Sequence, residues 1–199
     1  MTVTDRQRPR TKPPEIRREE LMDAAQRLFL EKGFAATSVA GIVDAADVAK
    51  GTFYLYFQTK DDVLAALQAR FVERFCERIE TAVSVAASDS WAQRLDAWME
   101  TCVLAYLDEV ALHDLVFHQF QPTKRDMKRA NPVVSRLTSF LVEGHAAGAF
   151  SFVDARLAAV MLFNAMHSAV DDCLADGPEV DRQRLVAAVT DFCRRSISA

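Results

Sequence analysis

The chain has 199 residues, of which 50% are hydrophobic and 26% are charged, a balance typical of a folded globular protein and not of a disordered one. Glycine and proline occur only six times each, so helices should be interrupted rarely and an all-α fold is expected. We expect a cytoplasmic protein without a membrane partner, because no apolar run reaches the length of a membrane span and the N-terminus is too polar for a signal peptide.

The formal net charge of −4 is unevenly distributed along the chain. Residues 1–60 hold 10 Lys and Arg against 8 Asp and Glu (+2), whereas residues 61–199 hold 14 against 20 (−6). Because DNA phosphates attract positive charge, contact with DNA is predicted for the first part. The acidic remainder argues against a protein that coats DNA without sequence preference. The four cysteines form no CxxC pair, which favours reduced thiols.

Residues 1–13 are a basic segment, which we predict to be a disordered tail in the free protein. An arm that lies along DNA is the alternative. A helix is predicted over residues 14–32, because Pro14 suits a first turn and Gly33 a helix end. Residues 14–60 are expected to form one DNA-binding domain.

The segment 38–57, SVAGIVDAADVAKGTFYLYF, predicts two short helices joined by a tight turn. The hydroxyls of Thr37 and Ser38 can each cap the first helix. Asp47 tolerates turn geometry, and the second helix opens at Lys50. This is a helix-turn-helix arrangement, in which the second helix is narrow enough to enter a major groove.

The motif resembles the DNA-binding region of the tetracycline-repressor (TetR) family, and the resemblance runs from about residue 14 to residue 71. The positions that match the family pattern are Thr37, Ser38, Val39, Ile42, Ala46, Val48, Lys50, Gly51, Thr52, Tyr54, Tyr56, Phe57, Lys60 and Leu64. The resemblance implies a homodimer that binds a double-stranded DNA operator and a small-molecule ligand. The residues assigned to DNA binding are Thr37, Ser38, Ala49, Lys50, Gly51, Thr52, Tyr54, Leu55, Tyr56 and Lys60.

Some positions of the motif depart from the family pattern. Asp47 replaces the usual turn glycine, so a left-handed backbone there is less comfortable. Ala49 has no hydroxyl with which to cap the second helix. Leu55 stands where many relatives carry a polar residue, and Phe53 and Phe57 are expected in the core. Lys60 resembles a family position that anchors a phosphate.

Residues 61–199 are expected to form a ligand-binding and dimerisation domain, which brings the total to about nine helices. Thr59 and Asp62 form a capping-box pattern at the start of a helix that runs to about residue 85. Further helices are predicted over about 91–108, 110–120, 132–145, 156–174 and 179–197. The helix after Asp154 is apolar almost all round, so the last two helices are expected to pair with their copies in a four-helix dimer interface.

A cavity for a small hydrophobic or amphipathic molecule is implied by the resemblance. The candidate ligand-binding residues are Trp98, Met99, Cys102, Phe117, His118, Phe140, Phe163, His167 and Asp171. The predicted function is a ligand-responsive, sequence-specific transcriptional regulator, a repressor released from its operator by that molecule, and not an enzyme.

The alternative is a metal-dependent helical-bundle enzyme or a metal sensor. Asp114 and His118 are four residues apart, as are His167 and Asp171, so each pair lies on one helix face. If these faces meet, the four side chains can hold a divalent metal. Hydrogen-bonded histidines inside an apolar bundle are the simpler interpretation.

Overall fold

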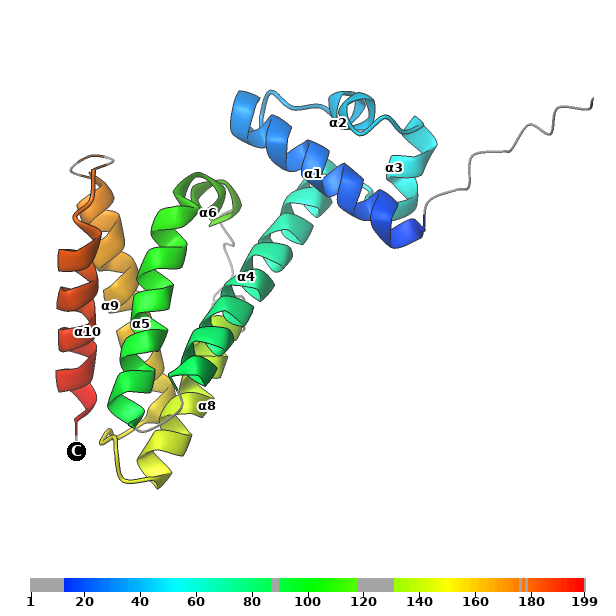
Figure 1. The fold of residues 1–199 in the computed structure, drawn as a ribbon. Helices are drawn as coiled ribbons and strands as arrows, with labels where there is room; N and C mark the ends of the chain where they lie inside the picture. Colours follow the sequence, from blue (N-terminus) through cyan, green and yellow to red (C-terminus); the bar gives the residue numbers. More distant parts are fainter. Residues whose placement is uncertain (1–12, 87–89, 118–130, 176, 178, 199) are drawn as a thin grey trace, which may run out of the picture. The chain divides into compact units, whose positions relative to one another are not determined.

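The computed structural model describes residues 13–86, 90–117, 131–175, 177 and 179–198. These residues form nine helices and no strand, apart from one isolated bridge between Phe150 and Ser198. The helices are α1 (Pro14–Lys32), α2 (Val39–Ala45), α3 (Lys50–Tyr56), α4 (Lys60–Val85), α5 (Trp91–Asp108), α6 (Val110–Phe117), α8 (Pro132–Ala146), α9 (Ala155–Ala175) and α10 (Arg182–Ile197). The predicted all-α class is confirmed, and residues 1–12 of the predicted tail lie outside the described residues (Figure 1).

The chain divides into two compact units, Met1–Leu67 and Gln68–Ala199, and α4 belongs to both. The division falls inside α4 and not at residue 60, because Val63, Leu64 and Leu67 on its first turns are buried. We call the described residues up to Leu67 the head and those from Gln68 onward the C-terminal unit.

The head is a small helical domain with one apolar core. α1 packs against α2 and α2 against α3, and α3 runs at a steep angle to α2 (Figure 1). The buried apolar side chains of these three helices are Leu21, Met22, Ala24, Ala25, Leu28, Phe29, Ile42, Val43 and Phe53. Phe53 and Phe57 are both buried, which confirms their predicted place in the core.

Local sequence signals set the helix ends of the head. Gly33 ends α1 with a φ of 82°, a value that glycine adopts at little cost. Ser38 caps α2, where its hydroxyl accepts a hydrogen bond from the Gly41 amide at 3.1 Å. Asp47, at the turn before α3, has a φ of 51° and is the described non-glycine residue with a positive φ. Ala49 precedes α3 without a side-chain cap, as its sequence predicts.

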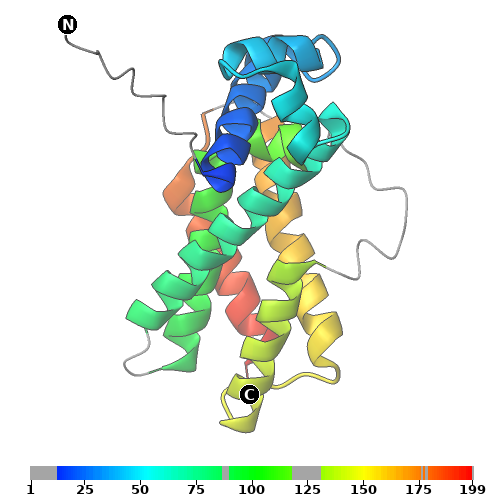
Figure 2. The same cartoon turned by 90° about the vertical axis from the view of Figure 1, so that its right-hand side faces the viewer.

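The C-terminal unit is a helical bundle. α10 packs against α5 and α9, and α8 packs against α9 (Figures 1 and 2). Arg136 of α8 lies 3.5 Å from a carboxylate oxygen of Glu73 and 3.3 Å from one of Glu80, both on α4. Arg182 of α10 donates a 2.7 Å hydrogen bond to Asp108 at the end of α5. The interior is apolar and the ion pairs lie at its margins.

α9 is the described helix that is long and apolar enough to span a membrane by length and composition alone. The expectation that no segment reaches this length was therefore wrong. Only 28% of its most apolar 18-residue window is buried within the chain, although α9 packs against α5, α8 and α10. Much of its apolar surface is thus left exposed by its own chain.

Candidate functional site

The exposed side of α3 carries most of the residues predicted to meet DNA. Lys50 and Gly51 are exposed at its start, and Tyr54 and Leu55 are 45% and 78% exposed further along. Phe53, in contrast, is fully buried and fixes the opposite side of the helix to the core. α3 is therefore held with its inner side in the head and its outer side open to a partner. Thr52 and Tyr56 are half-exposed at the edges of this surface.

Thr37 and Ser38 have structural roles before α2. Thr37 is 5% exposed, and its hydroxyl donates to the Gly33 carbonyl at 2.9 Å and lies 3.3 Å from the Leu28 carbonyl. These bonds tie the segment before α2 to the end of α1. Thr37 is thus directed into the head, which corrects its assignment as a DNA contact. Ser38 caps α2 and is exposed, so its side chain can still contact a partner.

Lys60 also differs from its expected role. Its ammonium donates to three backbone carbonyls of the segment between α1 and α2, at 2.7 Å to Phe34, 3.2 Å to Ala35 and 3.0 Å to Thr37. It also lies 4.5 Å from the centre of the Phe34 ring. An ammonium has three N–H donors, so this geometry uses all of them and leaves none for a phosphate. We interpret Lys60 as a clamp between α4 and the helix-turn-helix.

The capping box at the start of α4 holds this clamp in place. The Asp62 carboxylate accepts from the amides of Gln58 at 3.0 Å and Thr59 at 2.8 Å, and the Thr59 hydroxyl accepts from the Asp62 amide at 3.2 Å. These bonds favour the charged carboxylate and lower the pKa of Asp62, with the Thr59 amide as the main cause. The predicted cap is confirmed, and it fixes the turn that follows α3.

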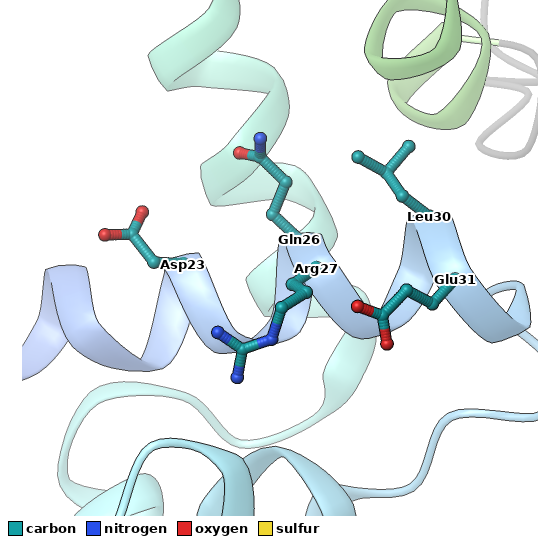
Figure 3. A pocket seen from close by; sticks show the side chains of 5 residues that line it. All are labelled: Asp23, Gln26, Arg27, Leu30 and Glu31. Atoms are coloured by element: carbon teal, nitrogen blue, oxygen red, sulfur yellow. The ribbon is translucent and has the colours of Figure 1, made fainter.

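An open hollow lies along α1 in the head. Its lining consists of Asp23, Gln26, Arg27, Leu30 and Glu31, which all come from that one helix (Figure 3). Arg27 reaches the Ala45 carbonyl of α2 at 3.4 Å. Two of the five side chains are carboxylates, which repel phosphate. This surface is therefore a solvated helix face and is unsuited to DNA.

A polar cluster in the C-terminal unit is formed by Tyr106 of α5, His113 of α6, and His167 and Asp171 of α9, and it extends from the buried Tyr106 and His113 to the exposed Asp171. The Tyr106 hydroxyl donates to the Asp171 carboxylate at 2.5 Å. The Nε2 atoms of His113 and His167 lie 3.1 Å apart, so one imidazole donates and the other accepts. The ring centres of Tyr106 and His113 lie 3.7 Å apart, with the two planes tilted by 32°. The cluster thus links three helices through hydrogen bonds that run from the apolar interior to the surface.

Burial determines the acid–base behaviour of this cluster. Tyr106 is 1% exposed and His113 is 3% exposed. Removal from water raises the pKa of Tyr106, and the hydrogen bond to Asp171 and the negative charge of that carboxylate raise it further. Tyr106 is therefore a neutral donor throughout the physiological range. The cluster offers hydrogen-bonding groups for the polar end of a ligand, and it contains no serine or cysteine that an adjacent base could activate.

The predicted metal site is not assembled as expected. His118 lies outside the described residues, and the histidine that faces His167 is His113. Asp114 lies beside His113, with 3.4 Å between its carboxylate and Nδ1. Among the described residues, no group of three His, Cys, Asp or Glu side chains is placed to hold a metal ion. Sequence reasoning missed His113 because it followed the Asp114 and His118 spacing, although His113 shares the apolar side of α6 with Val116.

The other predicted ligand-binding residues divide by burial. Trp98, Met99, Cys102 and Phe140 are at most 5% exposed, and the Trp98 and Phe140 rings lie 5.3 Å apart. They form core, and burial raises the pKa of the Cys102 thiol well above its usual value. Phe117 and Phe163 are half-buried and flank the polar cluster, with ring centres 4.9 Å from His113 and 4.5 Å from His167 respectively. Phe117, Phe163, His167 and Asp171 are therefore the predicted ligand-binding residues that lie in or beside the cluster, whereas Tyr106 and His113 were not predicted.

A second exposed feature is an apolar groove of about 380 Å³ between the start of α9 and the end of α10. Its large apolar members are strongly exposed: Val153 at 107%, Leu157 at 58%, Met161 at 64% and Phe192 at 54%. An exposed cluster of this kind marks a surface that another molecule covers. No spacing in the sequence identified these particular residues, because all of them also suit a core helix.

Comparison with known proteins identifies the head. A model of the tetR family of bacterial regulatory proteins matches residues 21–67, the range that spans most of α1, the helix-turn-helix and the first turns of α4. Residues 21–67 therefore form a tetR-family region of the chain. The match ends at Leu67, where the first compact unit also ends.

Curated proteins that resemble the chain are named as regulators or repressors. It is 39% identical to the fatty acid metabolism regulator protein of Bacillus subtilis over 61 residues. This matched segment is 31% of each of the two chains. The chain is 39% identical over 57 residues to the transcriptional repressor KstR2 of Rhodococcus jostii, covering 29% of this chain and 28% of that one. The chain thus matches about a third of the length of these relatives.

Solved structures resemble the chain over nearly its full length. The fatty acid degradation regulator FadR of Bacillus halodurans has a TM-score of 0.70 and 25% identity, and the match covers 93% of this chain and 97% of that one. A transcriptional regulator of the TetR/AcrR family from Thermobifida fusca has a TM-score of 0.70 and 26% identity, with coverage of 90% and 97%. The C-terminal unit therefore shares the family's fold as well.

Proposed function

We propose that this tetR-family protein is a sequence-specific transcriptional repressor that binds operator DNA as a homodimer and leaves it when a small molecule binds the C-terminal unit. The observation that carries the proposal is the arrangement of α3. Its inner side is fixed by Phe53, and its outer side presents Lys50, Gly51, Tyr54 and Leu55. A helix held in this way fits the major groove of duplex DNA.

The surface of α3 has the composition that a DNA reader needs. Lys50 supplies a cation for phosphate or for a guanine edge. Gly51 has no atom within 4 Å of the position that a Cβ would occupy, so its backbone can approach the duplex closely. Residues 1–60, which include α3, carry a net charge of +2, whereas residues 61–199 carry −6, so the acidic part of the chain is repelled by DNA phosphates.

A homodimer is proposed from the apolar groove of α9 and α10. The exposed side chains of Leu157, Met161 and Phe192 would lie against the same residues of a second copy, as a two-fold interface requires. Two heads are needed to read an operator whose half-sites are about 34–36 Å apart. The same contact covers the part of α9 that its own chain leaves exposed.

The polar cluster is the proposed receptor for the polar end of the ligand, with Phe117 and Phe163 against its apolar part. Two of the named proteins are regulators of fatty acid metabolism or degradation, so we propose an amphipathic molecule with a long hydrocarbon segment. Such a ligand acts as a switch only if it binds the DNA-free state more tightly than the DNA-bound state. Ligand binding at the polar cluster would thus release the protein from its operator. The proposed place of action is the cytoplasm, where the operator lies.

DNA binding is tested by selection from a pool of random duplexes with the full-length protein, followed by fluorescence anisotropy on the selected sequence. We expect a two-fold symmetric sequence and an affinity that falls steeply with salt. Lys50→Met should weaken binding, whereas Leu30→Ala, a change at a 44% exposed residue of α1, should not. Equal affinity for selected and scrambled duplexes would refute the proposal.

Dimerisation and ligand release need separate measurements. Met161→Glu should convert the dimer to a monomer in light scattering, whereas Val142→Glu, at a 51% exposed position of α8, should leave the dimer intact. Fatty acids of different chain length are the first probes for release. A ligand present at a hundred times its Kd should raise stability by about 2.7 kcal/mol, and it should lower DNA affinity in wild type more than in His167→Ala.

A further inference from the structure

The most exposed large hydrophobic side chain among the described residues of the head lies on the helix assigned to DNA. Leu55 is 78% exposed, compared with 45% for Tyr54 beside it and 44% for Leu30 on α1. Isolated exposed leucines are common on protein surfaces. Leu55 differs because of its place: it occupies the outer side of α3, the side that faces away from the buried Phe53.

Leu55 shares a face with Gly51. Residues four apart in a helix lie one above the other, so the glycine and the leucine are neighbours on the outer side of α3. No atom lies within 4 Å of a Cβ built on Gly51. The surface is therefore open at Gly51, where a flat partner can approach the backbone, and one turn later it presents the branched end of Leu55.

The chemistry of the major groove limits what Leu55 can contact. Base edges there present hydrogen-bond donors and acceptors, which a leucine cannot satisfy, and one apolar group, the C5-methyl of thymine. We infer that Leu55 is a specificity-determining residue that selects thymine at one position of each half-site through contact with this methyl group. The inference rests on the proposed DNA-binding function and adds the base that this residue reads.

The size of the effect follows from the size of one methyl group. Burial of one carbon of this kind changes affinity by roughly fourfold (about 0.8 kcal/mol). A homodimer contacts two half-sites, so removal of both methyl groups should weaken binding by roughly fifteenfold if the two contacts are independent. An effect of this size is readily measured by anisotropy titration.

The experiment replaces thymine by deoxyuridine in the selected duplex, one symmetric pair of positions at a time. This exchange removes only the C5-methyl and keeps base pairing intact. For the wild-type full-length protein, one pair of positions should lose roughly fifteenfold in affinity. For Leu55→Ala, the thymine and deoxyuridine duplexes should bind equally well. Leu30→Ala is the matched control, which should retain the wild-type dependence on the methyl group.

Each outcome is decisive for the inference. If no deoxyuridine position weakens the wild type, or if the dependence persists in Leu55→Ala, another residue reads the sequence and the inference is overturned, while the proposed function stands. If no sequence is enriched from the random pool, the proposed function fails and the inference fails with it. Because Leu55 is exposed and makes no core contact, its replacement should leave thermal unfolding of the head unchanged, which a scan of each variant verifies.

Discussion

Lys60→Met gives the sharpest test of how the helix-turn-helix is held. The change keeps an apolar side chain of similar length and removes the ammonium that donates to the carbonyls of Phe34, Ala35 and Thr37. A hydrogen bond to a charged group contributes about 1.5–3 kcal/mol. Lys60 is half-exposed, so water can replace part of this interaction, and we expect a total loss of about 2–3 kcal/mol and not the full sum.

The loss should be confined to the head. Both tryptophans, Trp91 and Trp98, lie in the C-terminal unit, so their fluorescence reports unfolding of that unit alone. In Lys60→Met, hydrogen exchange should accelerate for the amides of α2 and of the segment before it, while the tryptophan transition stays at the wild-type denaturant concentration. Unchanged exchange in α2 would show that the three carbonyl contacts contribute no stability.

The same variant separates a clamp from a phosphate contact. Each phosphate contact contributes about 0.9 to the slope of log affinity against log salt. A clamp positions α3 without touching DNA, so Lys60→Met should weaken binding equally at all salt concentrations and leave the slope unchanged. Lys50→Met, the comparison variant, should reduce the slope by about 1.8 for two heads. A similar reduction in Lys60→Met would refute the interpretation and restore the phosphate contact.

Three further predictions concern stability and reactivity. Folding lowers the pKa of Asp62 from its unfolded value near 3.8. The Asp62 carboxylate therefore stabilises the fold above that pH, and this stabilisation is lost as the pH falls through the folded pKa. In acid-unfolding curves, the stability difference between wild type and Asp62→Asn should shrink below about pH 4. Gly144→Ala should cost about 1–3 kcal/mol in urea unfolding, because a Cβ there would lie 2.3 Å from the buried Phe150 ring; a neutral result would show that the ring moves freely. Half-buried Cys173 should be the thiol that reacts first with Ellman's reagent in the native protein, because burial raises the pKa of Cys193 to about 12; two or more fast thiols would contradict this.

Helix ends were the part of the fold that the sequence predicted best. The predicted bounds 14–32 and 91–108 agree with α1 and α5, and the capping roles of Ser38 and Asp62 are confirmed. These features depend on residues within four positions of each other, so short-range spacing contains the necessary information. The last helix begins at Arg182, later than predicted, because Asp181 provides the cap by accepting from the Arg184 amide.

Roles of polar side chains were predicted less well. The predicted DNA contacts Thr37 and Lys60 turned out to bond backbone carbonyls within the head. In both cases the residue type and position suit a DNA contact equally well. Partners of Lys60 lie 23 to 26 residues earlier in the chain, and no periodicity reports contacts at that separation.

The sequence by itself determined the helices, their caps and the position of the helix-turn-helix, because each of these depends on the local chemistry of neighbouring residues. Tertiary structure decided which side chains meet: His113 opposite His167, Tyr106 on Asp171, and the apolar groove between α9 and α10. It also decided which residues remain on the surface, as with Leu55 on α3. An amphipathic pattern indicates that a face is buried, but the partner of that face is set by how the helices pack in three dimensions.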